Sequence, residues 1–133
     1  MVLIADQDHF SNSTLSLAIR KLGLARNVIC TTSATQALAY LHKQKTNSYP
    51  FPDLILYNPN APGMNPGEFL KNYENHFACD FESKLILLRD KGESIRPIFS
   101  HSSSEIGGYL KKPVSTGQLI RIFSGQEARE MIG

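Results

Sequence analysis

The sequence predicts a three-layer α/β domain, in which helices cover both faces of a parallel β-sheet. Short apolar runs alternate with segments whose apolar residues recur at helical spacing, and this order repeats about five times along the 133 residues. Most of the apolar runs show no strict polar alternation, which is typical of strands buried on both faces. Several helix starts also carry clear capping signals.

Five strands are predicted from the apolar runs. Parallel strands need long crossover connections, so we expect each strand to be followed by a helix that packs back on the sheet with right-handed chirality. The predicted strands are Val2–Ala5, Val28–Thr31, Leu54–Tyr57, Leu85–Leu88 and Gly108–Lys111.

Apolar stripes and capping motifs locate the helices. The first helix has an apolar stripe from Leu15 to Leu22, and Gly23 is expected to end it. Ser33 and Ser115 each begin a capping box, because a glutamine follows three residues later. Asn65 precedes a proline at the first helical position and a glutamate at the third.

One helix is expected to be irregular. The alternation of strands and helices places it between residues 92 and 105, but Pro97 lies in the middle of this segment. A proline inside a helix removes a hydrogen bond and costs roughly 3 kcal/mol. We therefore expect this helix to be short or displaced.

Length and composition limit the domain organisation and the classes of function. The length suits one domain, predicted to span residues 1–124, with 125–133 as a helical extension or tail. The net charge is only +2 and the basic residues are scattered, so direct binding to nucleic acid is disfavoured. No apolar run is long enough to cross a bilayer, and we expect no membrane association.

The cysteines indicate the cellular compartment. Cys30 and Cys79 are the two cysteines, and they suggest no disulfide framework. A reducing cytoplasm is therefore the expected location. Cys30 lies in an apolar run and is expected to be a small buried side chain.

Polar side chains are predicted at or just beyond the ends of four strands. They are Asp6, Asn58, Arg89 and Lys112. Doubly wound sheets place their binding sites outside the carboxyl ends of the strands, close to the point where the strand order reverses. We therefore expect these four side chains to point toward one edge of the sheet.

Four segments together resemble the receiver domains of two-component response regulators. They are residues 2–8 with an acidic cluster, 53–70 with a Pro-Gly-Met turn, 85–89, and 108–113 with a Lys-Pro ending. The resemblance covers nearly the whole chain, from Val2 to about Phe123. It implies a (βα)5 flavodoxin-like sandwich with a five-stranded parallel sheet of order 2-1-3-4-5, and a signalling role in a two-component phosphorelay pathway.

The resemblance also implies a phosphoacceptor site, from which this chain departs. In a working receiver, two adjacent acids and an acceptor aspartate hold Mg²⁺, while a hydroxyl residue and a lysine bind the phosphoryl oxygens. Asp6 matches the first acid and Lys112 matches the lysine before proline. Gln7 stands in place of the second acid, Asn58 in place of the acceptor and Arg89 in place of the hydroxyl residue.

These departures predict a site without phosphoacceptor chemistry. Asparagine carries no charge, and its amide nitrogen lone pair is delocalised. A rim of Asp6, Arg89 and Lys112 would carry about +1 charge and bind Mg²⁺ poorly, so we expect no metal and no cofactor. Either Arg89 or Lys112 is expected to pair with Asp6. Asn58 is expected to cap the next turn, and Asp8 the first helix.

The resulting hypothesis is a pseudo-receiver that is not an enzyme and acts through protein–protein interaction. Its expected partner is a sensor kinase, a downstream signalling protein or a second copy of the chain. The resemblance implies an output face formed by Tyr109, Lys111 and the helix that begins at Thr116.

Three alternatives stay open. The chain could be a genuine phosphoacceptor receiver that uses another acid, such as Asp6 or Asp8. It could be a flavodoxin-like ligand-binding module in which Ser11, Ser13 and Thr14 contact phosphate, although this loop lacks the glycine that close backbone approach needs. It could also be a purely structural dimerisation module.

Overall fold

The computed structural model describes residues 1–90 and 106–125 of the chain. The irregular helix expected within residues 92–105 and the tail from residue 126 onward lie outside the described residues. The described elements are β1 (Val2–Ala5), α1 (His9–Lys21), β2 (Val28–Thr31), α2 (Ala34–Thr46), β3 (Leu54–Tyr57), α3 (Pro66–His76), β4 (Lys84–Arg89), β5 (Ile106–Lys111) and α4 (Thr116–Phe123).

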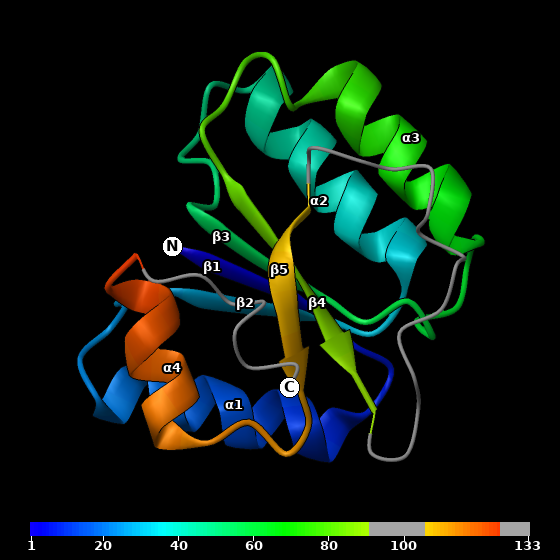
Figure 1. The fold of residues 1–133 in the computed structure, drawn as a ribbon. Helices are drawn as coiled ribbons and strands as arrows, with labels where there is room; N and C mark the ends of the chain where they lie inside the picture. Colours follow the sequence, from blue (N-terminus) through cyan, green and yellow to red (C-terminus); the bar gives the residue numbers. More distant parts are fainter. Residues whose placement is uncertain (91–105, 126–133) are drawn as a thin grey trace.

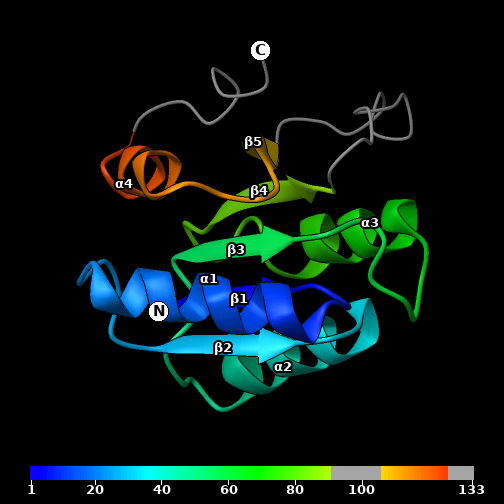
Figure 2. The same ribbon diagram turned by 90° about the horizontal axis from the view of Figure 1, so that it is seen from below.

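The five strands form one parallel sheet of order β2-β1-β3-β4-β5, which confirms the predicted fold class. Helices α1 and α4 cover one face, and α2 and α3 cover the other (Figure 1). Figure 2 shows the strand order from the turned view. Ala5 pairs with Thr31 of β2 and with Tyr57 of β3, so these three strands end at the same level. The residues that follow them therefore meet at one edge of the sheet.

Alternation along the strands divides the apolar side chains between two cores. Leu15, Ile19, Leu119 and Ile122 pack on one face of the sheet beneath α1 and α4. On the other face Tyr57 of β3 is fully buried among residues of α2 and α3. The strand that leads to Asn58 is therefore held from both sides.

The predicted capping residues occur at the helix starts. The side chain of Asp8 accepts hydrogen bonds from two backbone N–H groups of α1, and the side chains of Ser33 and Asn65 each accept one from the first turn of α2 and of α3. Ser115 and Gln118 form a complete capping box at the start of α4. Each of these caps satisfies backbone donors that the first turn of a helix leaves unpaired.

Two details differ from the sequence-based predictions. Both β4 and β5 are longer than predicted, because β4 spans Lys84–Arg89 and β5 begins at Ile106. The prediction that Cys30 is buried is wrong, since its side chain is exposed. The physical reason is the position of β2, which pairs only with β1 and forms an edge of the sheet.

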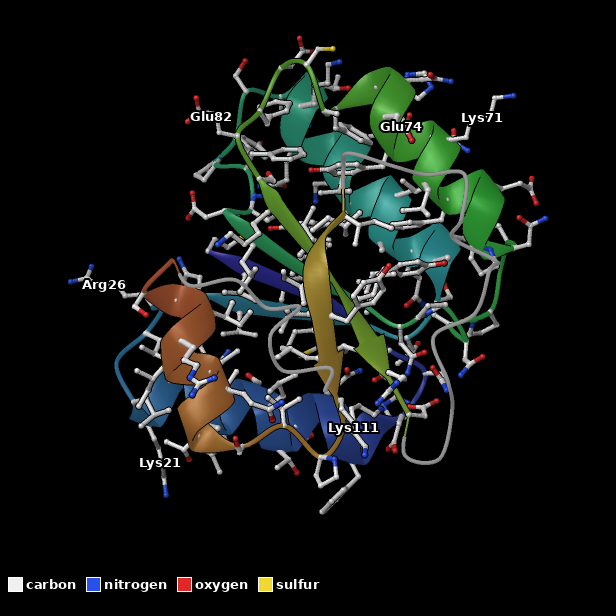
Figure 3. All side chains as sticks on the ribbon, in the orientation of Figure 1. Lys21, Arg26, Lys71, Glu74, Glu82 and Lys111 are labelled. Atoms are coloured by element: carbon white, nitrogen blue, oxygen red, sulfur yellow. The ribbon has the colours of Figure 1, made fainter. Side chains whose placement is uncertain are left out.

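Charged side chains are dispersed over the surface of the described residues. Figure 3 shows labelled examples that point outward from different elements: Lys21, Arg26, Lys71, Glu74, Glu82 and Lys111. No helix in the ranges 1–90 and 106–125 is both long enough and apolar enough to cross a membrane.

Candidate functional site

A buried cluster of polar side chains lies where β1, β3 and β5 end. Asp6 follows β1 and Asn58 follows β3, and the relative exposure of both residues is 0%. Lys112 follows β5, and its Nζ lies 2.7 Å from Oδ2 of Asp6. The Nδ2 atom of Asn58 lies 3.3 Å from the same carboxylate oxygen. Three of the four side chains predicted at this edge are thus in direct contact.

Both carboxylate oxygens of Asp6 are hydrogen bonded. Oδ1 accepts the backbone N–H of Asp8 at 2.9 Å, and Oδ2 accepts from Lys112 and Asn58. A buried carboxylate needs such partners, because an unpaired charge in the protein interior is costly. Of the two cations expected to pair with Asp6, the structure shows Lys112 in that position.

Asp90 is a member of the cluster that the sequence analysis missed. It comes directly after β4, and its Oδ1 lies 2.9 Å from Nδ2 of Asn58 and 3.0 Å from Nζ of Lys112. Its Oδ2 accepts a hydrogen bond from Nδ2 of Asn60 at 2.9 Å. The available signal was a carboxylate directly after a buried strand, but Arg89, the preceding residue, was expected at this edge instead.

The contacts of Asn58 fix the orientation of its amide. Nδ2 donates to the carboxylates of Asp6 and Asp90, whereas Oδ1 accepts the backbone N–H of Asn60 at 2.9 Å. The second contact is the expected turn cap. An inverted amide would bring its oxygen against two carboxylates, which would repel it. The acceptor position therefore presents N–H groups to the cluster.

Asp90 changes the predicted charge of the site. Two carboxylates, Asp6 and Asp90, contact one ammonium group, Lys112, so these three groups together carry −1 instead of the predicted +1. Desolvation would raise the pKa of Asp90, but hydrogen bonds from Asn60, Lys112 and Asn58 lower it below its usual range. Desolvation would lower the pKa of Lys112, but its bonds to the two carboxylates raise it. Both groups therefore stay ionised at neutral pH.

Gln7 and Arg89 do not join this cluster. Gln7 is exposed, and Arg89 forms no ion pair with any described residue. By strand alternation, Arg89 continues the row of Leu85 and Leu87, whose side chains pack on the α2 and α3 face. Its Nε is buried and has no hydrogen-bond partner among the described residues. Arg89 therefore faces away from the space that metal and phosphate occupy in a working receiver.

The two residues expected on an output face differ in exposure. Tyr109 packs partly against the core beneath α2 and α3, whereas Lys111 is exposed. Both lie on β5, which forms an edge of the sheet among the described strands.

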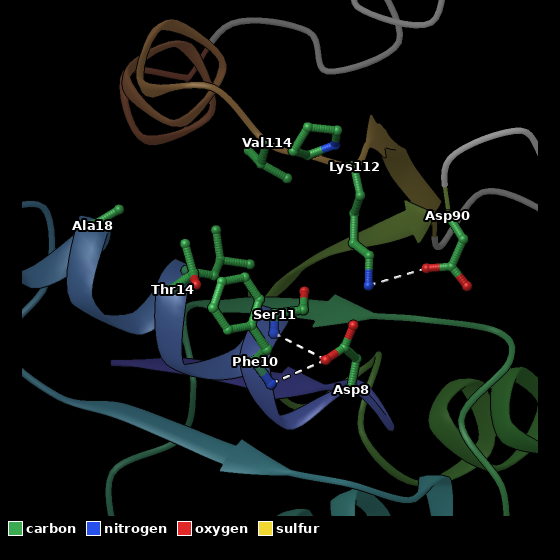
Figure 4. Close-up of a pocket in the computed structure, with 10 residues that line it drawn as sticks. Asp8, Phe10, Ser11, Thr14, Ala18, Asp90, Lys112 and Val114 are labelled. Atoms are coloured by element: carbon green, nitrogen blue, oxygen red, sulfur yellow. Dashed lines mark hydrogen bonds and ion pairs between the residues drawn. The ribbon is translucent and has the colours of Figure 1, made fainter.

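A cavity of about 430 Å³ adjoins the polar cluster (Figure 4). It lies between α1 and the segment that follows β5. Leu15, Ala18 and Val114 line its apolar part, and Asp90 and Lys112 lie at its polar end. The cavity therefore joins an apolar surface to the charged groups at the strand ends.

Several solved structures with this fold are two-component response regulators or receiver domains. A two-component response regulator from Cytophaga hutchinsonii superposes with a TM-score of 0.77 at 24% identity, over 92% of each chain. A two-component response regulator from Legionella pneumophila gives a TM-score of 0.75 at 24% identity, over 92% of this chain and 94% of that chain. The chain therefore has the fold of response-regulator receiver domains.

A third similar structure is a complex of two proteins. It is the co-crystal of the Saccharomyces cerevisiae histidine phosphotransfer signaling protein Ypd1 and the receiver domain of its downstream response regulator Ssk1. The TM-score is 0.70 at 15% identity, over 98% of this chain and 90% of that chain. No family model and no curated protein matches the sequence. The likeness to known proteins consequently lies in the fold, at low sequence identity.

Proposed function

We propose that this chain is a receiver-like signalling domain that is not phosphorylated, has no catalytic activity of its own, and acts by binding a protein partner. The observation that carries this proposal is the amide of Asn58, which is fully buried and donates hydrogen bonds to Asp6 and Asp90. An acceptor aspartate would offer an oxygen lone pair to phosphorus. The amide nitrogen offers N–H groups instead, and its lone pair is delocalised into the carbonyl.

The donor set around Asp6 does not fit Mg²⁺, which prefers oxygen ligands and binds carboxylates. Both oxygens of Asp6 are engaged by N–H groups, and the amide oxygen of Asn58 is engaged by Asn60. The ammonium group of Lys112 already balances charge at this position. Residues 1–90 and 106–125 contain no group of three or more side chains suited to hold a metal ion. Phosphoryl transfer would lack both its nucleophile and the cation that neutralises the phosphoryl charge.

Exposed apolar side chains on α1 support a role in protein binding. Phe10 is 80% exposed and Leu17 is 53% exposed. They are seven residues apart, so they lie on the same side of the helix. Large apolar groups in contact with water favour a site of protein interaction. The yeast co-crystal supports this proposal, because there a receiver domain is bound to another signalling protein.

Intact-mass spectrometry tests whether the chain is phosphorylated. The protein is incubated with acetyl phosphate and Mg²⁺, and we expect no gain in mass. A gain of one phosphoryl group would refute the proposal in favour of a receiver that uses another acid. Asp6→Asn and Asp8→Asn variants would then show which carboxylate accepts the group.

Isothermal titration calorimetry with histidine phosphotransfer proteins tests the protein-binding part. We expect a complex that Leu17→Ala weakens. The matched control is Lys71→Ala, which removes an exposed side chain from α3, on the opposite face of the sheet from α1. Equal affinity of the wild type and the Leu17→Ala variant would exclude the α1 surface as the contact.

A further inference from the structure

The cavity beside the polar cluster has the size and position of a ligand site. Its volume of about 430 Å³ falls within the range of roughly 300–1,000 Å³ that is typical of small-molecule pockets. It lies at the carboxyl ends of the strands, where doubly wound sheets bind their ligands. Figure 4 shows Thr14 and Ala18 of α1 across the cavity from Val114. Two separate segments thus form its walls.

The apolar part of the cavity has an exposed aromatic group at its mouth. Phe10 lines the cavity and is 80% exposed, whereas Leu15 on the inner wall is 5% exposed. Covering apolar surface contributes roughly 25 cal/mol for each Å² that is removed from water. A hydrocarbon chain placed between Phe10 and Val114 would gain this stabilisation from both walls.

Among the described residues that line the polar end of the cavity, acidic groups outnumber basic ones. Asp8 and Asp90 line it together with Lys112, and Lys112 is already paired with Asp90 and with the buried Asp6. These three carboxylates and one ammonium group have a net charge of −2. The partial positive charge at the start of α1, roughly half an elementary charge, does not reverse this sign. An entering anion would be repelled, whereas a cation would be attracted.

Asp8 is placed to contact such a cation. Its Oδ1 accepts the backbone N–H groups of Phe10 and Ser11 at 2.9 and 3.2 Å, which caps α1. Figure 4 shows that the other carboxylate oxygen points toward the end of the cavity where Lys112 lies. The helix cap therefore fixes the carboxylate and leaves one oxygen directed at the polar end.

From this arrangement we infer that the cavity binds a small amphipathic amine. Its hydrocarbon part lies against Phe10, Leu15 and Val114, and its ammonium group lies near Asp8. The inference is independent of the proposed function, because it holds whether or not the chain is phosphorylated. Amine binding would give the domain a chemical input at the edge of the sheet where phosphorylation acts in a working receiver.

A titration with three matched probes tests this inference. n-Hexylamine, n-hexanol and hexanoate have the same hydrocarbon chain and differ in the charge of the head group at neutral pH. Backbone amide shifts in NMR spectra report both the site and the affinity. We expect shifts centred on Thr14, Ala18 and Val114. Hexylamine should bind at least about tenfold more tightly than hexanoate, and the affinity of hexanol should lie between these two. Equal or tighter binding of hexanoate, or no binding at this site, would overturn the inference.

Three single substitutions test separately how the polar end and the apolar part of the cavity contribute to probe binding. Asp8→Asn keeps a side chain that caps helices well and removes one charge, so hexylamine affinity should fall about fivefold while hexanol affinity stays unchanged. Phe10→Ala should weaken all three probes. Leu17→Ala, on the same helix but outside the cavity lining, should change none of them. Undiminished hexylamine binding by the Asp8→Asn variant would contradict the proposed ammonium contact.

Discussion

Replacing Asn58 by aspartate would put a third carboxylate into a space that already holds two. The Nδ2 atom of Asn58 lies 3.3 Å from a carboxylate oxygen of Asp6 and 2.9 Å from one of Asp90. At such distances, two like charges repel by about 5 kcal/mol even at an effective dielectric constant near 20. Lys112 offsets roughly one of these repulsions. The introduced side chain is therefore expected to remain protonated in the folded protein.

The difference in proton binding between the folded and unfolded states determines how far Asn58→Asp lowers the free energy of unfolding. An aspartate in the unfolded chain has a pKa of about 3.9, so keeping the group protonated at pH 7 costs up to about 4 kcal/mol. The folded-state pKa of the introduced group is raised, so above pH 4 the unfolded chain binds fewer protons than the folded one. The stability of Asn58→Asp relative to the wild type should thus fall as pH rises from about 4, and level off above the folded-state pKa.

Urea unfolding at several pH values measures this difference. We expect Asn58→Asp to lower the free energy of unfolding relative to the wild type by less than about 1 kcal/mol near pH 4 and by about 3–4 kcal/mol at pH 7. Asn60→Asp is the matched control, because Asn60 also donates to Asp90 but is exposed, and its loss should stay near 1 kcal/mol. The reasoning would be refuted if the loss of unfolding free energy in Asn58→Asp did not change with pH. It would also be refuted if this loss equalled the loss in Asn60→Asp.

Four further outcomes are expected. Asn58→Asp alone should not gain a phosphoryl group from acetyl phosphate and Mg²⁺, as checked by intact mass, because Gln7 still stands in place of the second acid that would hold the metal ion. Lys112→Met should lower the free energy of unfolding by about 3–5 kcal/mol at neutral pH, since it leaves buried charge unpaired; urea unfolding that matches the wild type would contradict this. Tyr57→Phe should leave stability equal or slightly higher, because the buried hydroxyl has no hydrogen-bond partner in the described part of the chain, and a loss above about 1 kcal/mol would contradict this. Gly63→Ala should lower the melting temperature more than Gly23→Ala. Both glycines have positive φ, but a methyl group at residue 63 would collide with α2, whereas a methyl group at residue 23 would enter open space.

The fold could be predicted from the sequence because local signals and tertiary structure agree. The runs Val2–Ala5, Val28–Thr31 and Leu54–Tyr57 are strands with the predicted limits, since polar residues follow each apolar run. The helix caps Ser33 and Ser115 were equally clear, because a cap depends only on residues within one turn.

The composition of the polar cluster could be predicted only in part. Asp6, Asn58 and Lys112 lie together at this edge of the sheet because each directly follows the end of a strand. Asp90 was missed because Leu85–Leu88 is uniformly apolar and shows no alternation that would set the phase of the strand. A shift of one residue moves a side chain to the other face of a sheet. The sequence therefore could not decide whether Arg89 or Asp90 faces the cluster.

The ion pair between Lys112 and Asp6 bears on whether the stability of the domain depends on dissolved cations. A dissolved cation occupies a site only to the extent that its concentration allows, whereas a cation tethered to the backbone is always close at hand. Depleting magnesium with a chelator should leave the melting temperature unchanged, because the Lys112–Asp6 ion pair needs no dissolved cation. We therefore expect the resting state of this domain to be set by its own covalent structure rather than by dissolved magnesium.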